Sequence, residues 1–181
     1  WKLQYTWCIH NHTNGDRRMS STLYVDKIVE KTSAAGVHIP GHVIQVVSNY
    51  HAPSGHIEGS NTSLVSMGTA FELSITPKFS NSLILIDVLI SMAHVVSGTG
   101  LMHTITKAGT PINTPTYGSY FYTTGSSTAM YGPVSLQESS VAGGTSAITY
   151  GVSFRVDGNA ANVRALHNGG SYHIKLTEIA Q

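Results

Sequence analysis

The chain has 181 residues and a formal net charge of +1, and only 10% of its residues are Asp, Glu, Lys or Arg, against about 25% in ordinary soluble proteins. This length suits one domain, or one domain with an extended arm, and it allows a sizeable core. A net charge this close to zero provides no positively charged surface for phosphate groups, so nucleic acid is not expected as a partner. Low charge also removes a usual protection against self-association, and we expect a homo-oligomer.

The cysteine count and the apolar runs exclude two further classes of protein. Cys8 is the single cysteine, so the chain cannot form an internal disulfide, and folding in a reducing cytoplasm is expected. The longest apolar run, residues 83–90, is interrupted by Asp87 and is far shorter than the roughly 20 residues of a membrane helix. We therefore expect no membrane insertion.

The N-terminal part divides into two segments. Residues 1–18 begin with Trp1 and lack the apolar core of a secretory signal, and we treat them as a leader of uncertain origin, because Met19 reads like a natural start. Residues 19–41 combine a β-prone stretch with a Ser-Ala-Ala-Gly break and the Pro40-Gly41 turn signal. They predict an extended arm for attachment and trimerisation, followed by a compact domain at residues 42–181.

Alternation is the main structural signal in that domain. Ile148, Tyr150 and Val152 alternate with polar or small residues, which predicts a half-buried strand. Residues 83–86 are apolar at every position, which predicts a central strand covered on both faces, and residues 107–110 resemble a hairpin turn. Further strands are expected at residues 42–48, 71–76, 101–106, 119–123, 134–139 and 172–179. Short strands separated by Gly and Pro indicate an all-β antiparallel sandwich.

Histidines offer one candidate metal site. In a strand, His10 and His12 share a face, and three copies around a three-fold axis would supply six nitrogens for a transition metal. The other interpretation is a flexible or packing segment, and the sequence leaves both open. The histidines at positions 38–56 are interrupted by Pro40-Gly41, so a second metal site is not expected. No other cofactor is expected.

No catalytic arrangement stands out. The carboxylates are scattered and form no pair of the glycosidase kind, and no G-x-S-x-G nucleophile elbow occurs. Asp87, inside the apolar run, is either an interface residue with a hydroxyl or amide partner or a site residue with a shifted pKa. We therefore expect a protein that is not an enzyme.

Tyrosines form the candidate contact surface. Tyr117, Tyr120, Tyr122 and Tyr131 lie among Gly, Ser and Thr, and tyrosine offers a rigid apolar face with a polar tip at little entropic cost. The alternative is a trimer interface or core strand. The ligand interpretation predicts a site on loops at the far end of the sandwich, which contacts a glycan or a protein.

Three short sequence segments resemble those of a known family. They are residues 145–150 (Thr-Ser-Ala-Ile-Thr-Tyr), residues 73–77 followed by 82–86, and the terminal Leu-Thr-Glu-Ile-Ala at 176–180. In this order they resemble small β-sandwich structural proteins of tailed bacteriophages, particularly the tail-fibre or receptor-binding knobs of marine and cyanobacterial phages.

The resemblance implies a homotrimeric virion protein with a jelly-roll-like β-sandwich and an N-terminal arm that docks onto other virion proteins. It would be made in the host bacterial cytoplasm and carried on the tail or capsid surface. Its expected role is a tail fibre or adhesin for host attachment. The alternative is a capsid-bound head fibre or decoration protein, and a polysaccharide-degrading tail enzyme is the least favoured possibility.

Overall fold

The computed structural model describes residues 39–96, 98–113, 119–123, 129–157 and 163–181. Within these ranges the chain is all-β: it forms two antiparallel sheets and a short 3-10 turn, η1 (Thr69–Phe71), and it has no α-helix. No helix in this part of the chain is long and apolar enough to span a membrane. The predicted leader, and the predicted arm up to residue 38, lie outside the described residues.

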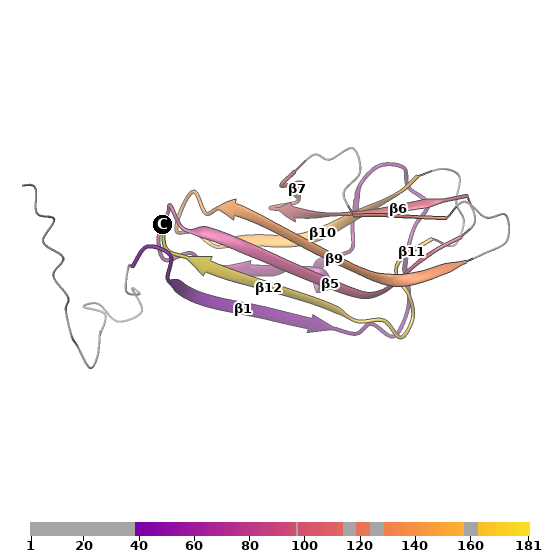
Figure 1. Cartoon of the computed structure of the whole chain (residues 1–181), viewed down its shortest axis with the longest axis horizontal. Helices are drawn as coiled ribbons and strands as arrows, with labels where there is room; N and C mark the ends of the chain where they lie inside the picture. Colours follow the sequence, from indigo (N-terminus) through magenta and orange to yellow (C-terminus); the bar gives the residue numbers. More distant parts are fainter. Residues whose placement is uncertain (1–38, 97, 114–118, 124–128, 158–162) are drawn as a thin grey trace, which may run out of the picture.

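The first layer, sheet I, contains the longest strands. Its members among the described residues are β1 (Val43–His51), β2 (Ile57–Glu58), β5 (Leu83–Val95), β9 (Met130–Val141), β11 (Arg164–Leu166) and β12 (Tyr172–Ile179). The strand β5 has β9 on one side and β12 on the other, and β1 lies beyond β12 (Figure 1). The short strands β11 and β2 continue the sheet beside the last residues of β5.

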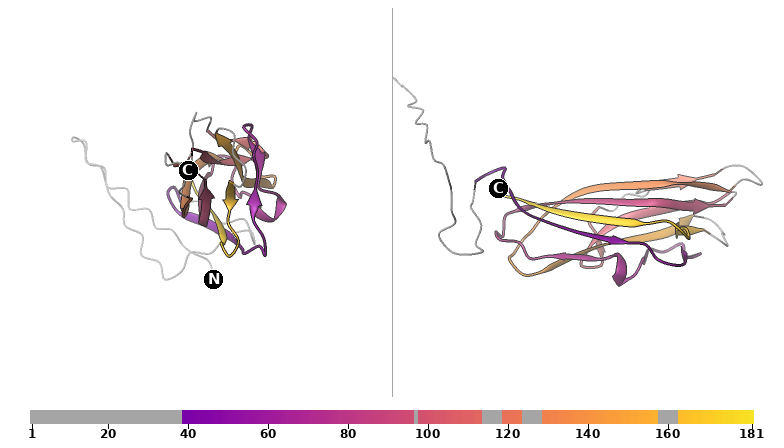
Figure 2. Two further views of the ribbon diagram at one scale, coloured as in Figure 1. Left: turned by 90° about the vertical axis from the view of Figure 1, so that its right-hand side faces the viewer. Right: turned by 90° about the horizontal axis from the view of Figure 1, so that it is seen from below.

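The second layer, sheet II, is centred on a long antiparallel pair. The described chain contributes β3 (Val65–Ser66), β4 (Leu73–Ile75), β6 (Gly100–Lys107), β7 (Thr110–Pro111), β8 (Ser119–Tyr122) and β10 (Ile148–Asp157). The strands β6 and β10 pair along their length, β3 and β4 pair with the far edge of β10, and β7 and β8 pair with the far edge of β6. Figure 2 shows the arrangement from two further directions.

The two sheets pack face to face around one core. From β5, Ile84 and Ile86 are fully buried, and from β10, Val152 and Phe154 belong to the same buried cluster. Each such side chain contributes about 1.5–3 kcal/mol when it leaves water. Alternate positions on these strands therefore hold the layers together, as the alternation in the sequence predicts.

The outer face of β5 corrects one prediction. Residues 83–86 were expected to be covered on both faces, but only one face is buried: Leu85 is 36% exposed and Leu89, further along the strand, is 47% exposed. A sheet with one covering layer buries alternate residues only. The apolar run therefore marks a strand that has apolar side chains on both faces, one of which stays uncovered in the single chain.

Local predictions of turns and strands are confirmed. Lys107 pairs with Thr110 in the β6–β7 hairpin, and Ala108 (φ 49°) and Gly109 (φ 77°) both have positive φ, as a type I′ turn requires. The bounds of β12 coincide with the strand predicted at residues 172–179, and the alternating residues Ile148, Tyr150 and Val152 all lie in β10. The strand predicted at residues 42–48 extends further, because β1 continues to His51, and the short strand β2 follows it.

The molecule has two distinct ends. Ile39, the first described residue, and Gln181 lie at one end, which we call the base (Figure 1). There Gly41 N–H donates to the Ala180 carbonyl at 2.8 Å, and Ala180 N–H donates to the His42 carbonyl at 2.9 Å. The strand β5 runs from the base to the opposite end, where β9 begins. We call that opposite end the distal end.

Candidate functional site

Four side chains form a row across sheet I near the distal end. Glu58 pairs with Arg164, Arg164 with His94, and His94 with Tyr131. Residues directly opposite each other on neighbouring strands share a face, so β2, β11, β5 and β9 each place one side chain on the same face. Because neighbouring strands lie about 4.8 Å apart, these four residues, which we call the distal row, span roughly 14 Å.

A β-bulge sets the direction of His94. Ile90 pairs with Val134 and Ala93 with Gly132, so β5 has one residue more than β9 between the two pairs. Ile90 and Ala93 are both fully buried, and His94 therefore points to the outer face. Strict alternation from Ile90 would have pointed His94 into the core. Bulges often re-aim a side chain beside a functional site in this way.

Aromatic contacts support the end of the row. The rings of His94 and Tyr131 lie 4.5 Å apart between centroids, at 37°, and His167 meets Tyr131 edge-on at 5.0 Å and 81°. His94 is buried by its surroundings, whereas Tyr131 remains 52% exposed. A half-exposed phenol on a fixed support is a rigid contact surface with a polar tip.

His56 ties the segment before β2 to the turn that follows β11. The Asn168 backbone N–H donates to Nδ1 of His56 at 2.8 Å, and Nδ1 of His167 donates to the Asn168 carbonyl at 3.0 Å. A nitrogen that accepts a hydrogen bond carries no proton, so the first bond requires a neutral His56. Desolvation lowers the pKa of His56, Arg164 and His167 lower it further, and Glu58 acts in the opposite direction.

The other end of the row carries an ion pair. Arg164 Nε lies 3.4 Å from Glu58 Oε2, and the side chains are 21% and 54% exposed. A pair this exposed contributes no more than about 1 kcal/mol to stability. Its chemical effect is to place a donor and an acceptor beside the aromatic groups while leaving the ion pair without net charge.

A second aromatic pair lies on sheet II. The rings of Tyr120 and Tyr122, both on β8, stack at 5.7 Å and 11°, and the Tyr120 hydroxyl donates to Asp157 Oδ2 at 2.8 Å. The Tyr120 ring lies over Gly100, where an added Cβ would come within 2.5 Å of the phenol oxygen. Glycine at this position therefore makes room for the tyrosine.

The structure separates the predicted tyrosines. Tyr120 and Tyr122 lie on sheet II and Tyr131 on sheet I, so they form two surfaces, and each of the three is more than one third exposed. All three belong to strands, which corrects the expectation of a loop-built site. Tyr117, His10 and His12 lie outside the described residues. Among those that the structure describes, no group of three or more His, Cys, Asp or Glu is arranged to hold a metal ion.

Sequence reasoning missed the partners of Tyr131. His56, His94, Arg164 and His167 come from distant segments. Strand register places Arg164 and His94, and the contacts of the turn after β11 place His56 and His167. One signal was present: His94 is an imidazole at the end of a long apolar strand. Alternation from Ile90 would have counted it as a core residue, so the bulge would have had to be known first.

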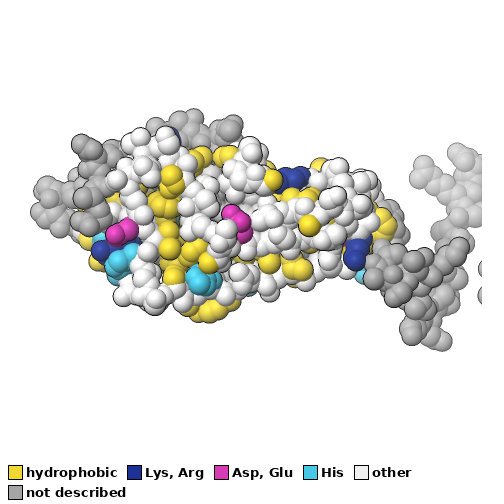
Figure 3. Space-filling model, turned by 180° about the vertical axis from the view of Figure 1, so that it is seen from behind, with side chains coloured by type: hydrophobic (Ala, Val, Ile, Leu, Met, Phe, Trp, Pro, Cys, Tyr) yellow, Lys and Arg dark blue, Asp and Glu magenta, His cyan; other side chains and the backbone are white. Residues whose placement is uncertain are grey.

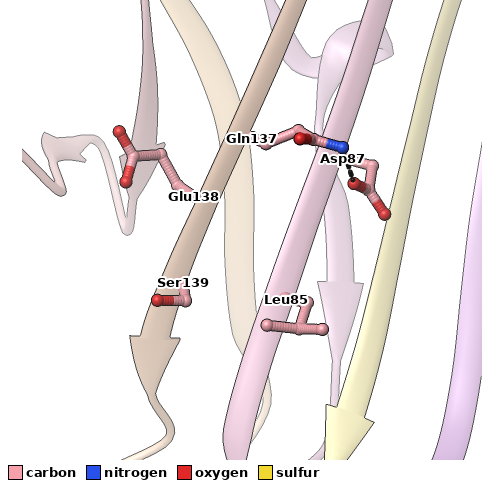
Figure 4. Close-up of a pocket in the computed structure, with 5 residues that line it drawn as sticks. All are labelled: Leu85, Asp87, Gln137, Glu138 and Ser139. Carbon is pink, nitrogen blue, oxygen red and sulfur yellow. Dashed lines mark hydrogen bonds between the residues drawn. The ribbon is translucent and has the colours of Figure 1, made fainter.

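A shallow hollow marks the outer face of sheet I between β5 and β9. It is lined by Leu85, Asp87, Gln137, Glu138 and Ser139 (Figure 4). Gln137 Nε2 donates to Asp87 Oδ1 at 3.0 Å, and Lys175 Nζ lies 2.9 Å from Asp87 Oδ2. Asp87 thus has the amide partner expected of an interface residue. Figure 4 shows Glu138 pointing away from Asp87, so the two carboxylates do not converge on one point.

A fully buried imidazole lies in the core. His103 on β6 donates from Nε2 to the carbonyl of Ala165, the residue after Arg164, at 3.1 Å. Burial lowers the pKa of His103 to about 4, although the bond to Ala165 acts in the opposite direction. His103 is therefore neutral at ordinary pH, and its contact is with the strand that carries Arg164.

Comparison with models of known protein families gives no match, and no curated protein is similar enough to count as a relative. The assignment of a function therefore depends on the geometry of the chain itself.

Proposed function

We propose that this chain is a non-enzymatic structural protein of a bacteriophage virion, a homotrimeric tail fibre or adhesin that contributes to attachment to the host surface. Its two sheets then form a jelly-roll-like β-sandwich, and residues 19–41 form the arm that grips another virion protein. The observation that carries the proposal is the difference between the two ends of the domain. The chain enters the described domain at the base (Figure 1). Tyr120, Tyr122 and Tyr131 are exposed and lie toward the other end, beside the first residues of β6 and in the first residues of β9.

The uncovered face of sheet I, in the part between the base and Leu89, supports self-association. Val46 and Leu85 come from different strands of this face and are 53% and 36% exposed, and Leu89 and Tyr50 are more exposed than Leu85. The Lys175–Asp87 pair near the middle of the face carries no net charge. Figure 3, which shows the side of the molecule opposite to sheet I, likewise has only a few separated charged side chains. Little electrostatic repulsion therefore opposes the association of identical copies.

The contacts of the carboxylates support a role other than catalysis. Glu178 is held by the backbone N–H groups of Lys78 and Phe79, and Asp157 accepts from Tyr120. Asp87 is engaged by Lys175 and Gln137, as described above. Each of these three carboxylates is therefore engaged by a hydrogen bond or an ion pair that links separate segments of the fold.

The test is to locate the protein on intact particles of the phage that encodes it. Gold-labelled antibody against the described domain is expected on the tail, in electron micrographs of negatively stained virions. Labelling of the head would favour the decoration protein, and particles without label would contradict the virion assignment. Light scattering of the purified chain at micromolar concentration is expected to give the mass of a trimer.

A surface variant makes the trimer measurement sharper. Leu89→Glu places a charge on the uncovered face of sheet I, where it costs the monomer little because Leu89 is exposed. The variant is expected to be monomeric and folded. Tyr122→Glu, on sheet II, is the control and is expected to remain a trimer. A monodisperse monomer of the unaltered chain would overturn the trimeric arrangement.

A further inference from the structure

We propose that the distal row is a binding subsite for a neutral glycan, with Tyr131 as the surface on which a sugar ring stacks. The proposal rests on the proposed function, because it names the kind of host-surface molecule that the protein contacts. It also selects one of the two tyrosine surfaces. The ligand is placed on sheet I, at Tyr131, and not on the Tyr120–Tyr122 pair of sheet II.

The order of chemical groups in the row matches a sugar. A pyranose has an apolar face made of C–H groups and a rim of hydroxyls that donate and accept hydrogen bonds. Tyr131 offers an exposed ring, and Arg164 and Glu58 offer a donor and an acceptor two and three strands away. One end of the row therefore suits the apolar face of a sugar, and the other end suits hydroxyl groups.

The charge of the row favours a neutral ligand. Arg164 is already paired with Glu58, and the carboxylate is the more exposed partner, at 54% against 21% for the guanidinium. His56 accepts a hydrogen bond at Nδ1 and so is neutral. A uronic acid or sialic acid would meet an exposed carboxylate without an unpaired cation to compensate it. Sugars that carry only hydroxyls avoid this repulsion.

The distal row is preformed, so a ligand does not have to order it on binding. Its four residues lie on strands, and the turn that carries His167 is fixed by the hydrogen bond from His167 N–H to the Met92 carbonyl at 2.8 Å. The span of roughly 14 Å set by strand spacing accommodates a short oligosaccharide. A preformed surface avoids much of the entropic cost of ordering on binding.

The same geometry favours binding without cleavage. Glycosidases use two carboxyl groups about 5–9.5 Å apart on either side of the scissile bond. The distal row contains one carboxylate, Glu58, and that group is paired with Arg164. The subsite is therefore expected to hold a sugar and to release it unchanged.

The test uses an array of immobilised bacterial oligosaccharides, both neutral and acidic, probed with the fluorescently labelled full-length chain. The unaltered chain is expected to bind a subset of the neutral oligosaccharides. Tyr131→Ala is expected to weaken that binding at least tenfold, because trimer avidity multiplies the loss at each site. Tyr131→Phe keeps the ring and is expected to bind within about threefold of the unaltered chain, which separates loss of stacking from loss of folding.

The matched control is Tyr122→Ala, an exposed tyrosine on the other sheet, which is expected to leave binding unchanged. Loss of binding in Tyr122→Ala with full binding in Tyr131→Ala would overturn the subsite and leave the proposed function intact. Preference for acidic oligosaccharides, or no binding to any neutral one, would also overturn the subsite. If host cells still bound the chain after periodate destroyed their glycans, a protein receptor would replace the glycan. Absence of both cell binding and virion labelling would instead contradict the proposed function.

Discussion

At the base, polar groups point inward and are satisfied mainly by the main chain. Glu178 is fully buried, and its Oε1 accepts from the backbone N–H groups of Lys78 at 2.8 Å and Phe79 at 3.3 Å, while Oε2 accepts from Gln45 Nε2 at 2.6 Å. At the distal end the arrangement is reversed. Glu58 and Tyr131 lie on the outer face, and each is more than half exposed.

The difference separates two tasks. A buried carboxylate held by three donors fixes the segment after β4 against β12 and offers nothing to a partner. An exposed carboxylate and an exposed phenol contribute little to stability and keep their surface available. Substitutions at the base are therefore expected to change folding, and substitutions at the distal row are expected to change binding.

The largest expected effect is at Glu178. Glu178→Ala leaves two backbone N–H groups and the Gln45 amide without their acceptor, and we expect a loss of about 4 kcal/mol in the free energy of unfolding. Glu58→Ala, the control at the other end, is expected to cost less than about 1 kcal/mol. Urea unfolding of both variants measures the difference. Equal losses would remove the contrast between the ends.

Acid is expected to act through the imidazole in the core. The pKa of His103 is lowered from 6.5 to about 4, so the neutral form is favoured in the folded state. Its contribution to stability is complete above pH 6.5 and is lost as the pH falls through 4, which amounts to about 3 kcal/mol. Urea unfolding at pH 7 and pH 4 measures this loss. His103→Gln should show a flatter pH profile, and an unchanged profile would assign the acid sensitivity to other groups.

The turn behind the distal row can be disturbed without changing a contact residue. An added Cβ at Gly170 would lie 2.8 Å from the His167 carbonyl and 2.7 Å from Leu166 Cδ1, so the turn must shift. Gly170→Ala is expected to cost about 2 kcal/mol and to weaken glycan binding. Gly144→Ala, where nothing lies within 4 Å of the added atom, is the control. Thermal unfolding and the array measure both effects, and full binding by Gly170→Ala would separate the turn from the site.

The smallest expected effect is local and depends on pH. The pKa of His56 is lowered from 6.5, so the hydrogen bond from Asn168 N–H to His56 Nδ1 is present above pH 6.5 and is lost as the pH falls below it. Protection of the Asn168 amide against hydrogen exchange should then decrease. The Lys78 amide, bound to Glu178 at the base, should remain protected. Parallel loss at both amides would indicate global unfolding.

Features that depend on residues close together in the sequence could be predicted from the sequence alone. The strands β10 and β12 follow from local alternation, and the type I′ turn at Ala108-Gly109 follows from turn chemistry. The outer face of β5 was misjudged, because an apolar run does not say how many layers cover it. The exposed side of residues 83–86 can be recognised only when it is known that a single second sheet covers the strand.

The distal row could not be predicted in the same way. Glu58, Arg164 and His94 become neighbours only through strand register, and the bulge after Ile90 reverses the face on which His94 lies. Tyr131 was singled out correctly as exposed, but its grouping with Tyr120 and Tyr122 assumed that aromatic residues close in sequence share a surface. Their strands belong to different sheets.

The length of β5 has a mechanical consequence. Its 13 residues extend over roughly 43 Å, and it is paired with β9 and β12 along much of that length. Antiparallel hydrogen bonds are perpendicular to the strands, so a load applied between the base and the distal end stretches many of them at once in shear. Sliding by one residue would also turn the buried side chains out of the core. The domain is therefore expected to resist pulling most strongly along the line that joins its point of entry to the distal row.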